Sequence, residues 1–548
     1  MKRTILLITG AIIIIAACAI FTITGGPETV IVNPEFDNTN VDYISLHKIE
    51  RTDTATILYA DVYHLPNYWI YLSSSGKLRD SKGKTYKLLD CKGFELDKEV
   101  YMPASGSMSL VLYFEPVDKT EKVVDYIDMD ENNEVITDIK LYNVKHNEPV
   151  RCLLKGEVID RPQSSRMALL KQGEDFRAAK VTCIPIHDGK FEYMLYANFE
   201  EAYQLIFYDE IMKSSWRPVD FIAESGTCRF ILHNGGIHGG SNEWEKNSVH
   251  GGKYTETYLA IIDSLRKEME PFEKELDAKL SKLYEEKKYY TPEANNLIEQ
   301  AEKASDNDPK RTALWERFYK MENVGTSKTQ ETKDLENELA QIYRTMYVDK
   351  LTEYAKEHAD ITGYTFLVEN IRSAMGHNHD QLDVTSLFAV FHDTYEKKYP
   401  NHPYTSLIKN HMQANAVAIG NPCPDITAED NEGNEVNVSE LIKGKVALIH
   451  LWASWCGTCR RHGKEMIPIY ETYKDKGFTV VGIAREQTKE SMLNALDKDN
   501  YPWINLLELN DKNGIWTKFG VGNAGGGEFL VDAQGNFLAV GTSPEEIE

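Results

Sequence analysis

The sequence predicts a multidomain protein with two N-terminal all-β domains, an α-helical domain and a C-terminal α/β domain. Three observations lead to this prediction. The chain has 548 residues, which is too long for one hydrophobic core at about 150 residues per domain. Apolar residues alternate in short runs up to about residue 246, and then recur every three or four residues up to about residue 414. Beyond residue 415, apolar strands take turns with helix-like segments.

The composition is that of a globular protein, with 42% hydrophobic and 27% charged residues. The formal net charge is −24, and no cluster of Lys and Arg interrupts the acidic balance. A nucleic-acid partner would need a basic face, because its phosphates repel an acidic surface. We therefore expect no nucleic-acid partner, and the acidity is accounted for by solubility alone.

Residues 1–26 are predicted to be a signal peptide, a lipoprotein signal or a membrane anchor. Lys2 and Arg3 precede an apolar run from Ile5 to Ile23, as in the charged and hydrophobic regions of a secretory signal. The letters "IAAC" place small residues before Cys18, which resembles a bacterial lipobox and predicts lipidation of Cys18. If the run is not cleaved, its roughly 19 residues are just long enough to span a bilayer. Both alternatives place residues 27–548 outside the cytoplasm and tether the protein to a membrane by its N-terminus.

Residues 27–146 are predicted to form a β-sandwich-like domain, and residues 147–246 a second β-rich domain. Runs such as "TATILYADVYH", "MSLVLYFEP" and "KFEYMLY" alternate apolar and polar positions between turn residues. The stretch "HNGGIHGGSN" contains His233 and His238, with His250 close behind. No Lys-Ser/Thr pair follows its glycines, so a phosphate loop is disfavoured. A loop is favoured over a histidine metal site, since co-ligands at recognisable spacing are missing.

Residues 247–414 are predicted to form the helical domain. One long amphipathic helix is indicated by apolar residues at helical spacing, namely Leu259, Ile262, Leu265, Met269, Phe272, Leu276, Leu280 and Leu283. Pro271 is expected to kink this helix. The stretch "GHNHD", with His377 and His379, reads as a polar loop between helices, and metal binding there is the lesser alternative.

The eight cysteines are too widely spread for a disulfide-framework scaffold. Cys152, Cys183 and Cys228 could include one structural bridge, or they could be buried thiols. The remaining pattern of interest is "WASWCGTCR", in which Cys456 and Cys459 lie two residues apart behind two tryptophans.

This pair follows the apolar strand "KVALIHLW" and opens a helix-like segment that runs through Tyr473. Another strand, another helix near 488–498 and two final strands come after it, which is the thioredoxin order and predicts that fold for residues 415–548. At a helix N-terminus the free N–H groups and the helix dipole stabilise a thiolate. Cys456 is therefore predicted to be the attacking nucleophile and Cys459 the resolving thiol, with a Cys456–Cys459 disulfide in the oxidised form.

Two other interpretations of the pair are weaker. A zinc site would need further ligands, and Cys423 and His462 are the nearby candidates without suitable spacing. A purely structural disulfide between residues three apart at a helix start would be easily reduced, and would still behave as redox-active. We expect no metal and no cofactor at this site.

The segment that begins "IGNPCPDITAEDNEGNEVNVSEL" and continues to "WASWCGTCRRHGKEMIP" resembles the TlpA/ResA-like family of extracytoplasmic thioredoxin-fold proteins. The matching pieces are Gly420-Asn421-Pro422, Pro424-Asp425, the acidic-Gly turn at 430–434, Gly444-Lys445, Trp452 to Cys456 (Trp455 included) and Pro468. The second β-rich segment, residues 147–246, is followed by helices and in this looks like the N-terminal extension of Bacteroidetes thiol-disulfide oxidoreductases. The resemblance implies a membrane-tethered, periplasm-facing protein that acts on disulfides.

Two residues near the pair depart from the family. Thioredoxins usually carry an acidic residue six positions before the first cysteine, where this chain has His450. A buried neutral imidazole could accept the proton of Cys459, or His450 could be an ordinary core histidine. Glu486 in "AREQ" is the nearest match to a family glutamate that follows the next strand, offset by about one residue.

A third departure lies opposite the cysteines. The family has a cis-proline before its "FLID" strand, and its backbone pairs with substrate. This chain has "FGVGNAGGGEFLVD" instead, with Gly526 at the proline position. The resemblance assigns substrate binding to Gly525, Gly526 and Gly527. Because cis peptides are essentially a proline feature, we expect a different and less preorganised loop.

The sequence thus predicts an enzyme, an extracytoplasmic thiol-disulfide oxidoreductase that reduces or isomerises disulfides of client proteins. Its expected partners are disulfide-containing clients and a membrane electron-donor thiol protein. One alternative is a thiol peroxidase of the AhpC/TSA type, although that class places Pro and Thr ahead of a single peroxidatic cysteine. The other alternative is a non-enzymatic envelope binding protein whose thioredoxin domain is vestigial.

Overall fold

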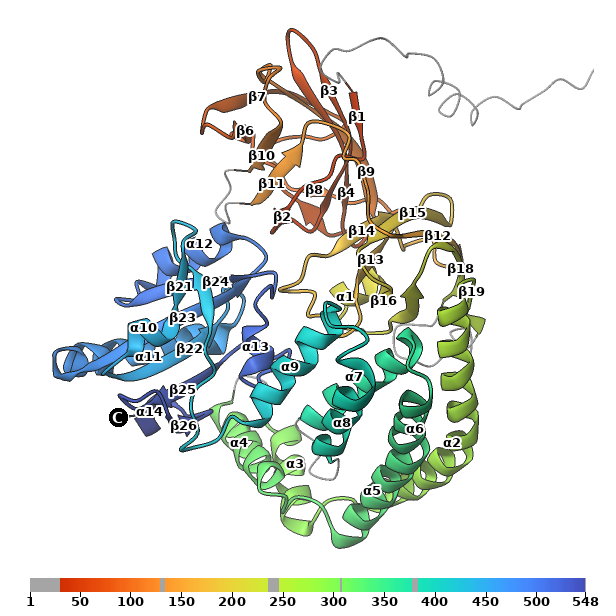
Figure 1. Cartoon of the computed structure of the whole chain (residues 1–548), viewed down its shortest axis with the longest axis vertical. Coiled ribbons are helices and arrows are strands. Elements are labelled where there is room, and N and C mark those ends of the chain that lie inside the picture. The colour runs from red at the N-terminus through yellow and green to blue at the C-terminus, as the bar shows by residue number, and fades with distance from the viewer. Residues whose placement is uncertain (1–29, 129–133, 235–245, 306–307, 377–382, 548) are drawn as a thin grey trace, which may run out of the picture. The chain divides into compact units, whose positions relative to one another are not determined.

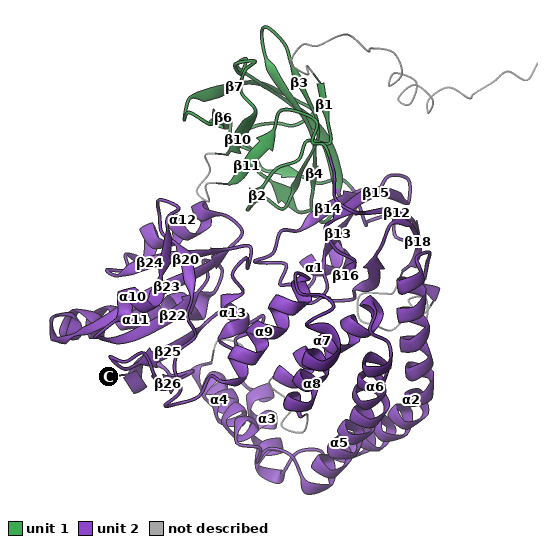
Figure 2. Cartoon of the chain, viewed as in Figure 1, with its two compact units in different colours: residues 1–103, 107–145 green, residues 104–106, 146–548 purple. Residues whose placement is uncertain are grey.

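The computed structural model describes residues 30–128, 134–234, 246–305, 308–376 and 383–547 (Figure 1). The chain forms two compact units (Figure 2). Within the described residues, the first unit comprises 30–103 and 107–145, and the second comprises 104–106 and everything from His146 onward. The N-terminal signal-like segment, with Cys18, lies outside the described residues. Among the residues that are described, no helix is both long and apolar enough to cross a membrane.

The described part of the first unit is entirely β. A nine-stranded sheet has the order β1-β3-β4-β9-β7-β6-β10-β11-β2, and β5 pairs with β8 in a separate ribbon. The strands are β1 (Val30–Val32), β2 (Asn38–Thr39), β3 (Ile44–Arg51), β4 (Thr56–Tyr63), β5 (Trp69–Ile70), β6 (Lys77–Asp80), β7 (Thr85–Lys92), β8 (Val100–Tyr101), β9 (Ser107–Phe114), β10 (Val123–Ile127) and β11 (Val135–Lys140). The first half of β7 pairs with β6 and its second half with β9. The strands on both sides of β7 share one hydrophobic core, which includes Leu58, Leu112, Tyr126 and Ile139.

The second unit begins with two four-stranded sheets in its described residues, ordered β15-β12-β18-β19 and β14-β13-β16-β17. The elements are β12 (Val150–Ile159), β13 (Arg166–Lys171), β14 (Thr182–Pro185), β15 (Lys190–Ala197), β16 (Glu201–Phe207), α1 (Tyr208–Met212), β17 (Val219–Ala223), β18 (Gly226–His233) and β19 (Ser248–His250). Strands β12 and β18 are parallel, and the other pairs are antiparallel. Both sheets contribute to one core, with Leu154 and Phe230 from the first and Leu169 and Phe221 from the second.

A helical part follows, as the change of apolar period predicted. Its elements are α2 (Lys253–Glu285), α3 (Pro292–Lys303), α4 (Pro309–Asn323), α5 (Gln330–Tyr343), the π-helical turn η2 (Arg344–Asp349), α6 (Lys350–Glu357), α7 (Ile361–Met375), α8 (Val384–Val390), the π-helical turn η3 (Phe391–Tyr395) and α9 (Pro403–Asn415). The predicted long helix is α2, which continues through Pro271 without ending there. Helix α3 begins where the sequence places a cap and a proline, since Thr291 accepts a hydrogen bond from the Ala294 N–H and Pro292 takes the first helical position.

The helices pack on the second β-rich part. Ala202 and Ile222, from β16 and β17, belong to the same buried cluster as the residues of α7 and α9. The Ala202 N–H donates to the Tyr404 hydroxyl at 2.8 Å, and His402 Nε2 lies 2.9 Å from the Glu200 carbonyl oxygen. The second β-rich part and the helical part therefore share one interior.

Residues 415–547 are described in full and form a seven-stranded sheet in the order β21-β20-β24-β23-β22-β25-β26. Its elements are β20 (Thr427–Glu429), β21 (Glu435–Asn437), α10 (Val438–Ile442), β22 (Val446–Trp452), α11 (Gly457–Tyr473), the 3₁₀ turn η4 (Lys474–Lys476), β23 (Phe478–Glu486), α12 (Lys489–Asp499), β24 (Ile504–Leu509), α13 (Ile515–Lys518), β25 (Gly527–Val531), β26 (Phe537–Val540) and α14 (Pro544–Ile547). Strands β22, β23 and β24 are parallel, and β25 and β26 form the antiparallel end. The fold class predicted from the sequence is confirmed.

The interior strand β22 is buried on both faces, so its alternating residues point into two different cores. Ile449 and Leu451 belong to the cluster that includes Phe529 and Trp516. Leu448 belongs to the opposite cluster, with Met466 of α11. His450 is two residues from Leu448 and therefore lies on the face that α11 covers.

Candidate redox site

The two cysteines lie where β22 turns into α11. Cys456 is the N-cap residue of α11, and its Sγ accepts a hydrogen bond from the Cys459 N–H at 3.2 Å. The two sulfurs form a disulfide, as predicted. Cys456 is half-buried and Cys459 is buried, while Gly457 and Thr458 between them are exposed. A reacting group can therefore approach Cys456 more readily than Cys459.

In the described part of the chain, Cys91, Cys152, Cys228 and Cys423 are free thiols, and the sulfur of Cys183 lies 3.8 Å from Nη1 of Arg166. Of the two possibilities left open for Cys152 and Cys228, the structure shows buried thiols rather than a bridge. Burial raises the pKa of Cys152 to about 11 and of Cys423 to about 12. Neither thiol has thiolate character near neutral pH, so neither competes chemically with Cys456.

His450 is buried next to a carboxylate that the sequence reasoning did not single out. It lies opposite Glu528 in the register of β22 and β25, with 3.5 Å between His450 Nδ1 and Glu528 Oε1. The same Oε1 lies 3.0 Å from Nδ1 of His462 on α11. Burial alone would raise the pKa of Glu528, but its contacts with the two histidines outweigh burial and lower the pKa. The face of β22 beneath α11 thus holds a His450–Glu528–His462 cluster.

Nε2 of His450 has no hydrogen-bond partner among the described residues, although the side chain is almost completely buried. Buried polar atoms are rarely left without a partner, and exceptions often mark a functional position. This nitrogen lies on the face of the sheet that α11 covers.

Glu486 ends β23 and points at the turn that leads to the cysteines. Its carboxylate accepts hydrogen bonds from the N–H of Ser454 and, at 2.8 Å, from the Ser454 hydroxyl. Burial raises the pKa of Glu486 to about 7, partly opposed by these hydrogen bonds and by Arg460. Glu486 is therefore a titratable group near neutral pH that contacts Ser454, two positions before Cys456.

Two of the three glycines, Gly525 and Gly526, place bare backbone against the disulfide. A Cβ atom at Gly525 would lie 2.4 Å from Cys456 Sγ and 3.3 Å from Cys459 Sγ. A Cβ atom at Gly526 would lie 1.9 Å from the Leu451 carbonyl oxygen and 3.2 Å from Cys459 Sγ. These distances leave no room for any side chain at either position. Gly527 is the first residue of β25, so the glycines join the loop to the strand.

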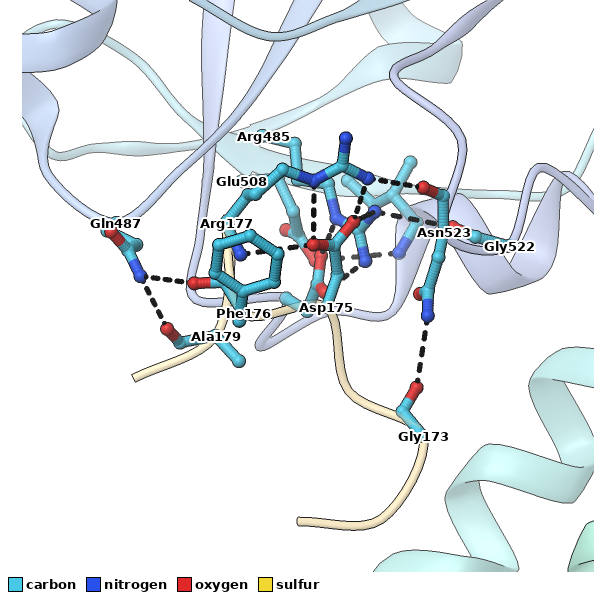
Figure 3. Close-up of polar contacts among 12 residues, drawn as sticks. Gly173, Asp175, Phe176, Arg177, Ala179, Arg485, Gln487, Glu508, Gly522 and Asn523 are labelled. Atoms are coloured by element: carbon cyan, nitrogen blue, oxygen red, sulfur yellow. Dashed lines mark hydrogen bonds and ion pairs between the residues drawn. The ribbon is translucent and has the colours of Figure 1, made fainter. Parts of the chain in front are cut away.

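Trp455 is covered by an arginine from a distant part of the sequence. The guanidinium carbon of Arg177 lies 4.0 Å from the centre of the Trp455 ring system. Arg177 belongs to the segment after β13, and no pattern in the sequence connects it with the site. Figure 3 shows this segment where it meets residues of the C-terminal domain.

No group of three or more His, Cys, Asp and Glu suited to a metal ion occurs in the part of the chain that the structure describes. Of the histidines considered earlier as ligands, His238, His377 and His379 lie outside the described residues. His462 contacts Glu528, and Cys423 is a separate free thiol.

A dithiol at the start of a helix, after the central strand of a mixed sheet with an antiparallel end, defines a thioredoxin-fold redox domain. Residues 419–539 match the model of the AhpC/TSA family. The DsbE thiol:disulfide interchange protein of Allochromatium vinosum is 28% identical over 120 residues, which cover 21% of this chain and 62% of that relative. The ResA thiol-disulfide oxidoreductase of Bacillus thuringiensis is 26% identical over 122 residues, or 22% of this chain and 68% of that protein.

Two further similarities were found, one to a curated protein and one to a solved structure. A mitochondrial protein of Arabidopsis thaliana named as a probable glutathione peroxidase 3 is 31% identical over 179 residues, which cover 28% of this chain and 81% of the relative. Among solved structures, the thioredoxin domain of a thiol-disulfide oxidoreductase from Bacteroides vulgatus is 27% identical. That match covers 24% of this chain and 93% of the solved one, with a TM-score of 0.23.

Residues 419–539 therefore form an AhpC/TSA-family domain, and the relatives of this chain include proteins named as thiol-disulfide oxidoreductases. The family resemblance and enzyme class predicted from the sequence are confirmed. The family model matches residues 419–539, and the two oxidoreductase relatives each match 21–22% of the chain, so the two β-rich parts and the helical part lie outside the match of the family model.

Proposed function

We propose that the protein is an extracytoplasmic oxidoreductase that reduces or isomerises disulfides of client proteins through Cys456 and Cys459. The observation that carries this proposal is the pair itself. A half-buried sulfur caps α11 and a buried sulfur lies one turn inside the helix, within bonding distance. This order of exposure suits an attacking thiol and a resolving thiol.

In the reducing direction the reaction starts from the dithiol. The Cys456 thiolate attacks one sulfur of the client disulfide, which forms a mixed disulfide and releases the other client sulfur as a thiolate. Cys459 then loses its proton and attacks Cys456 Sγ, which forms the Cys456–Cys459 disulfide and releases the second client thiolate. The client gains two electrons and two protons, and a donor dithiol supplies the same number to restore the enzyme.

The residues beneath the pair suit the proton transfers of this reaction. The N-terminus of α11 favours the thiolate of Cys456. We assign to His450 the role of accepting the Cys459 proton, since Nε2 is buried and has no hydrogen-bond partner among the residues that the structure describes, and Glu528 would stabilise the resulting imidazolium. Glu486, with a pKa of about 7, is a second proton-exchanging group beside the turn at Ser454.

The proposed location outside the cytoplasm rests on the N-terminal sequence, where Lys2 and Arg3 precede the apolar run that contains Cys18. Tethered in this way, the redox domain would meet client proteins in the envelope and a membrane thiol protein as electron donor. Radiolabelled palmitate or mass spectrometry of the mature N-terminus tests the tether. Lipid on Cys18 supports the lipoprotein alternative, and an intact N-terminus in the membrane fraction supports the uncleaved anchor.

Turnover of insulin disulfides by the soluble fragment 27–548 with dithiothreitol tests the oxidoreductase proposal. The wild-type fragment and a Cys423→Ser control should precipitate insulin at the same rate, and Cys456→Ser should fall to the rate of dithiothreitol alone. Consumption of hydrogen peroxide faster than insulin reduction would favour a thiol peroxidase. Inactivity of the wild-type fragment in both assays would overturn the proposal and favour a binding protein.

A further inference from the structure

A nine-residue segment of the second β-rich part, residues 172–180, lies against the C-terminal domain (Figure 3). The segment leaves β13 at Lys171 and returns to the sheet at β14. It is anchored through its backbone, because the Gln487 side-chain amide donates to the carbonyl oxygens of Phe176 at 2.9 Å and Ala179 at 2.8 Å. Gln487 directly follows β23, the strand that ends at Glu486.

The segment is also anchored through a buried pair of opposite charges. Arg485 Nη1 lies 3.5 Å from Asp175 Oδ2, and both side chains are almost completely buried. The other side of the Arg485 guanidinium donates to Asp511, with 2.6 Å between Nε and Oδ1. Removing one partner of such a pair leaves a buried charge uncompensated. The segment is therefore held in one place relative to β23.

Arg177 extends from this anchored segment to two sides of the redox site. Asp175 fixes its guanidinium, with 2.9 Å between Nε and Oδ1 and 2.6 Å between Nη2 and Oδ2. On one side the guanidinium lies 4.0 Å from the Trp455 ring. On the other side Nη2 donates to the carbonyl oxygen of Asn523 at 2.7 Å.

The second contact holds the loop that covers the disulfide. Asn523 precedes Gly525 by two residues, and its own side-chain amide donates to the Gly173 carbonyl oxygen at 3.4 Å. Arg485 Nη1 donates to the neighbouring Gly522 carbonyl oxygen at 3.3 Å. The first half of the loop is thus tied to the anchored segment, while its glycine half rests on the two sulfurs.

We propose that Arg177 is a positioning residue of the redox site, supplied by the second β-rich part. Consecutive glycines lose more backbone freedom on ordering than any other residues, so a loop built from them needs support from outside. Arg177 provides that support by joining Trp455 and Asn523 across the mouth of the site. A client strand would then meet a loop that is already in place over Cys456. This inference rests on the proposed oxidoreductase function.

Arginine suits this role better than lysine. Its planar group stacks on an indole and donates in two directions at once, whereas an ammonium is a single charged point. Arg177→Lys should therefore restore part of what Arg177→Ala loses. If Arg177 only filled space at the interface, Arg177→Lys would not recover part of what Arg177→Ala loses.

The test compares the fragment 27–548 with its Arg177→Ala and Arg177→Lys variants. Arg79→Ala is the matched control, because Arg79 has the same exposed fraction (39% against 38%) and also pairs with one aspartate through Nε and Nη2. Two quantities are measured in each protein. One is the hydrogen-exchange rate of amides in residues 521–528, and the other is kcat/KM for insulin and for the small disulfide of oxidised glutathione.

In Arg177→Ala we expect exchange in residues 521–528 to quicken about tenfold and kcat/KM for insulin to fall about tenfold, in line with the loss of one stacking contact and one charged hydrogen bond. The rate with oxidised glutathione should change less than about twofold, because a small disulfide does not need the loop. Arg177→Lys should lie between, and Arg79→Ala should match the wild type.

Exchange that stays within about twofold of the wild type in Arg177→Ala overturns the inference, whatever the activity. Quicker exchange with unchanged insulin kinetics also overturns it, since the contact would then be structural only. A wild-type fragment that reduces neither disulfide overturns the proposed function instead, and the exchange rates still report whether Arg177 holds the loop.

Discussion

Glu528 of β25 lies directly across from His450 of β22, with 3.5 Å between the carboxylate Oε1 and the imidazole Nδ1. The position of His450 is the one at which thioredoxins usually carry an acid. This chain keeps a carboxylate in the same buried layer, but supplies it from the neighbouring strand and bridges it to His462 of α11.

Replacing Glu528 with Gln should destabilise the protein in a pH-dependent way. The pKa of Glu528 is lowered in the folded state, so its ionised form contributes stability above the unfolded pKa of about 4.3, and this contribution disappears as the pH falls through the folded pKa. We expect a loss of about 1–3 kcal/mol at pH 7, measured by urea unfolding. The loss should shrink toward zero near the lowest pH at which the protein stays folded.

An equal loss at both pH values would contradict this account, because it would show that the Glu528 charge contributes nothing. His462→Gln serves as the matched variant. It removes one of the two partners of Glu528, and it should shift the pH dependence in the same direction by a smaller amount.

Glu486 should have the opposite effect. Its pKa is raised to about 7 by burial, so the folded state binds a proton that the unfolded chain has already released above about pH 4.3. The wild-type protein therefore loses stability between about pH 4.3 and 7, by about 3 kcal/mol from the size of that shift. Glu486→Gln removes this loss, and its stability relative to the wild type should rise by that amount from pH 5 to pH 8.

Urea unfolding of both proteins at the two pH values measures this difference. A Glu486→Gln curve parallel to that of the wild type would show that the carboxylate titrates normally. The same variant should retain the Cys456–Cys459 disulfide, because Glu486 contacts Ser454 and not the sulfurs.

Introducing a side chain into the glycine loop should destabilise the protein. Gly526→Pro would reinstate the residue type that the family has there, yet its Cβ would lie 1.9 Å from the Leu451 carbonyl oxygen. Gly525→Ala would place a methyl group 2.4 Å from Cys456 Sγ. Both variants should lose about 1–3 kcal/mol of stability, seen as a lower midpoint in thermal unfolding.

Gly457→Ala is the control for stability, because a Cβ atom there meets nothing within 4 Å. It should not be destabilised, since alanine is also the better helix former at the start of α11. Unfolding midpoints that are equal for Gly525→Ala and Gly457→Ala would contradict the close approach of the loop to the disulfide.

The sequence predicted those parts of the fold and site that depend on local pattern. The alternation in β4, the helical stripe of α2 and the strand-to-helix turn at Cys456 all follow from residue spacing over a few turns. Glu486 could be predicted as a site residue for the same reason, because it follows the apolar run of β23.

The missed residues depend on long-range register. Glu528 is opposite His450 only because β25 pairs antiparallel with β22, and the sole local signal was a charge ahead of the apolar letters "FLV". Arg177 is separated from Asn523 by 346 positions, and no periodicity connects them. The glycines were noticed, but the contact of their backbone with both sulfurs follows from loop geometry that spacing does not contain.

Trapping a mixed disulfide tests the central claim most directly. The reduced Cys459→Ser fragment is mixed with insulin as a defined disulfide, and the products are mapped by mass spectrometry before and after reduction. We predict a covalent adduct through Cys456 that dithiothreitol releases, and none in Cys456→Ser/Cys459→Ser. No adduct, or an adduct through Cys423 instead, would contradict the assignment of Cys456 as the attacking thiol.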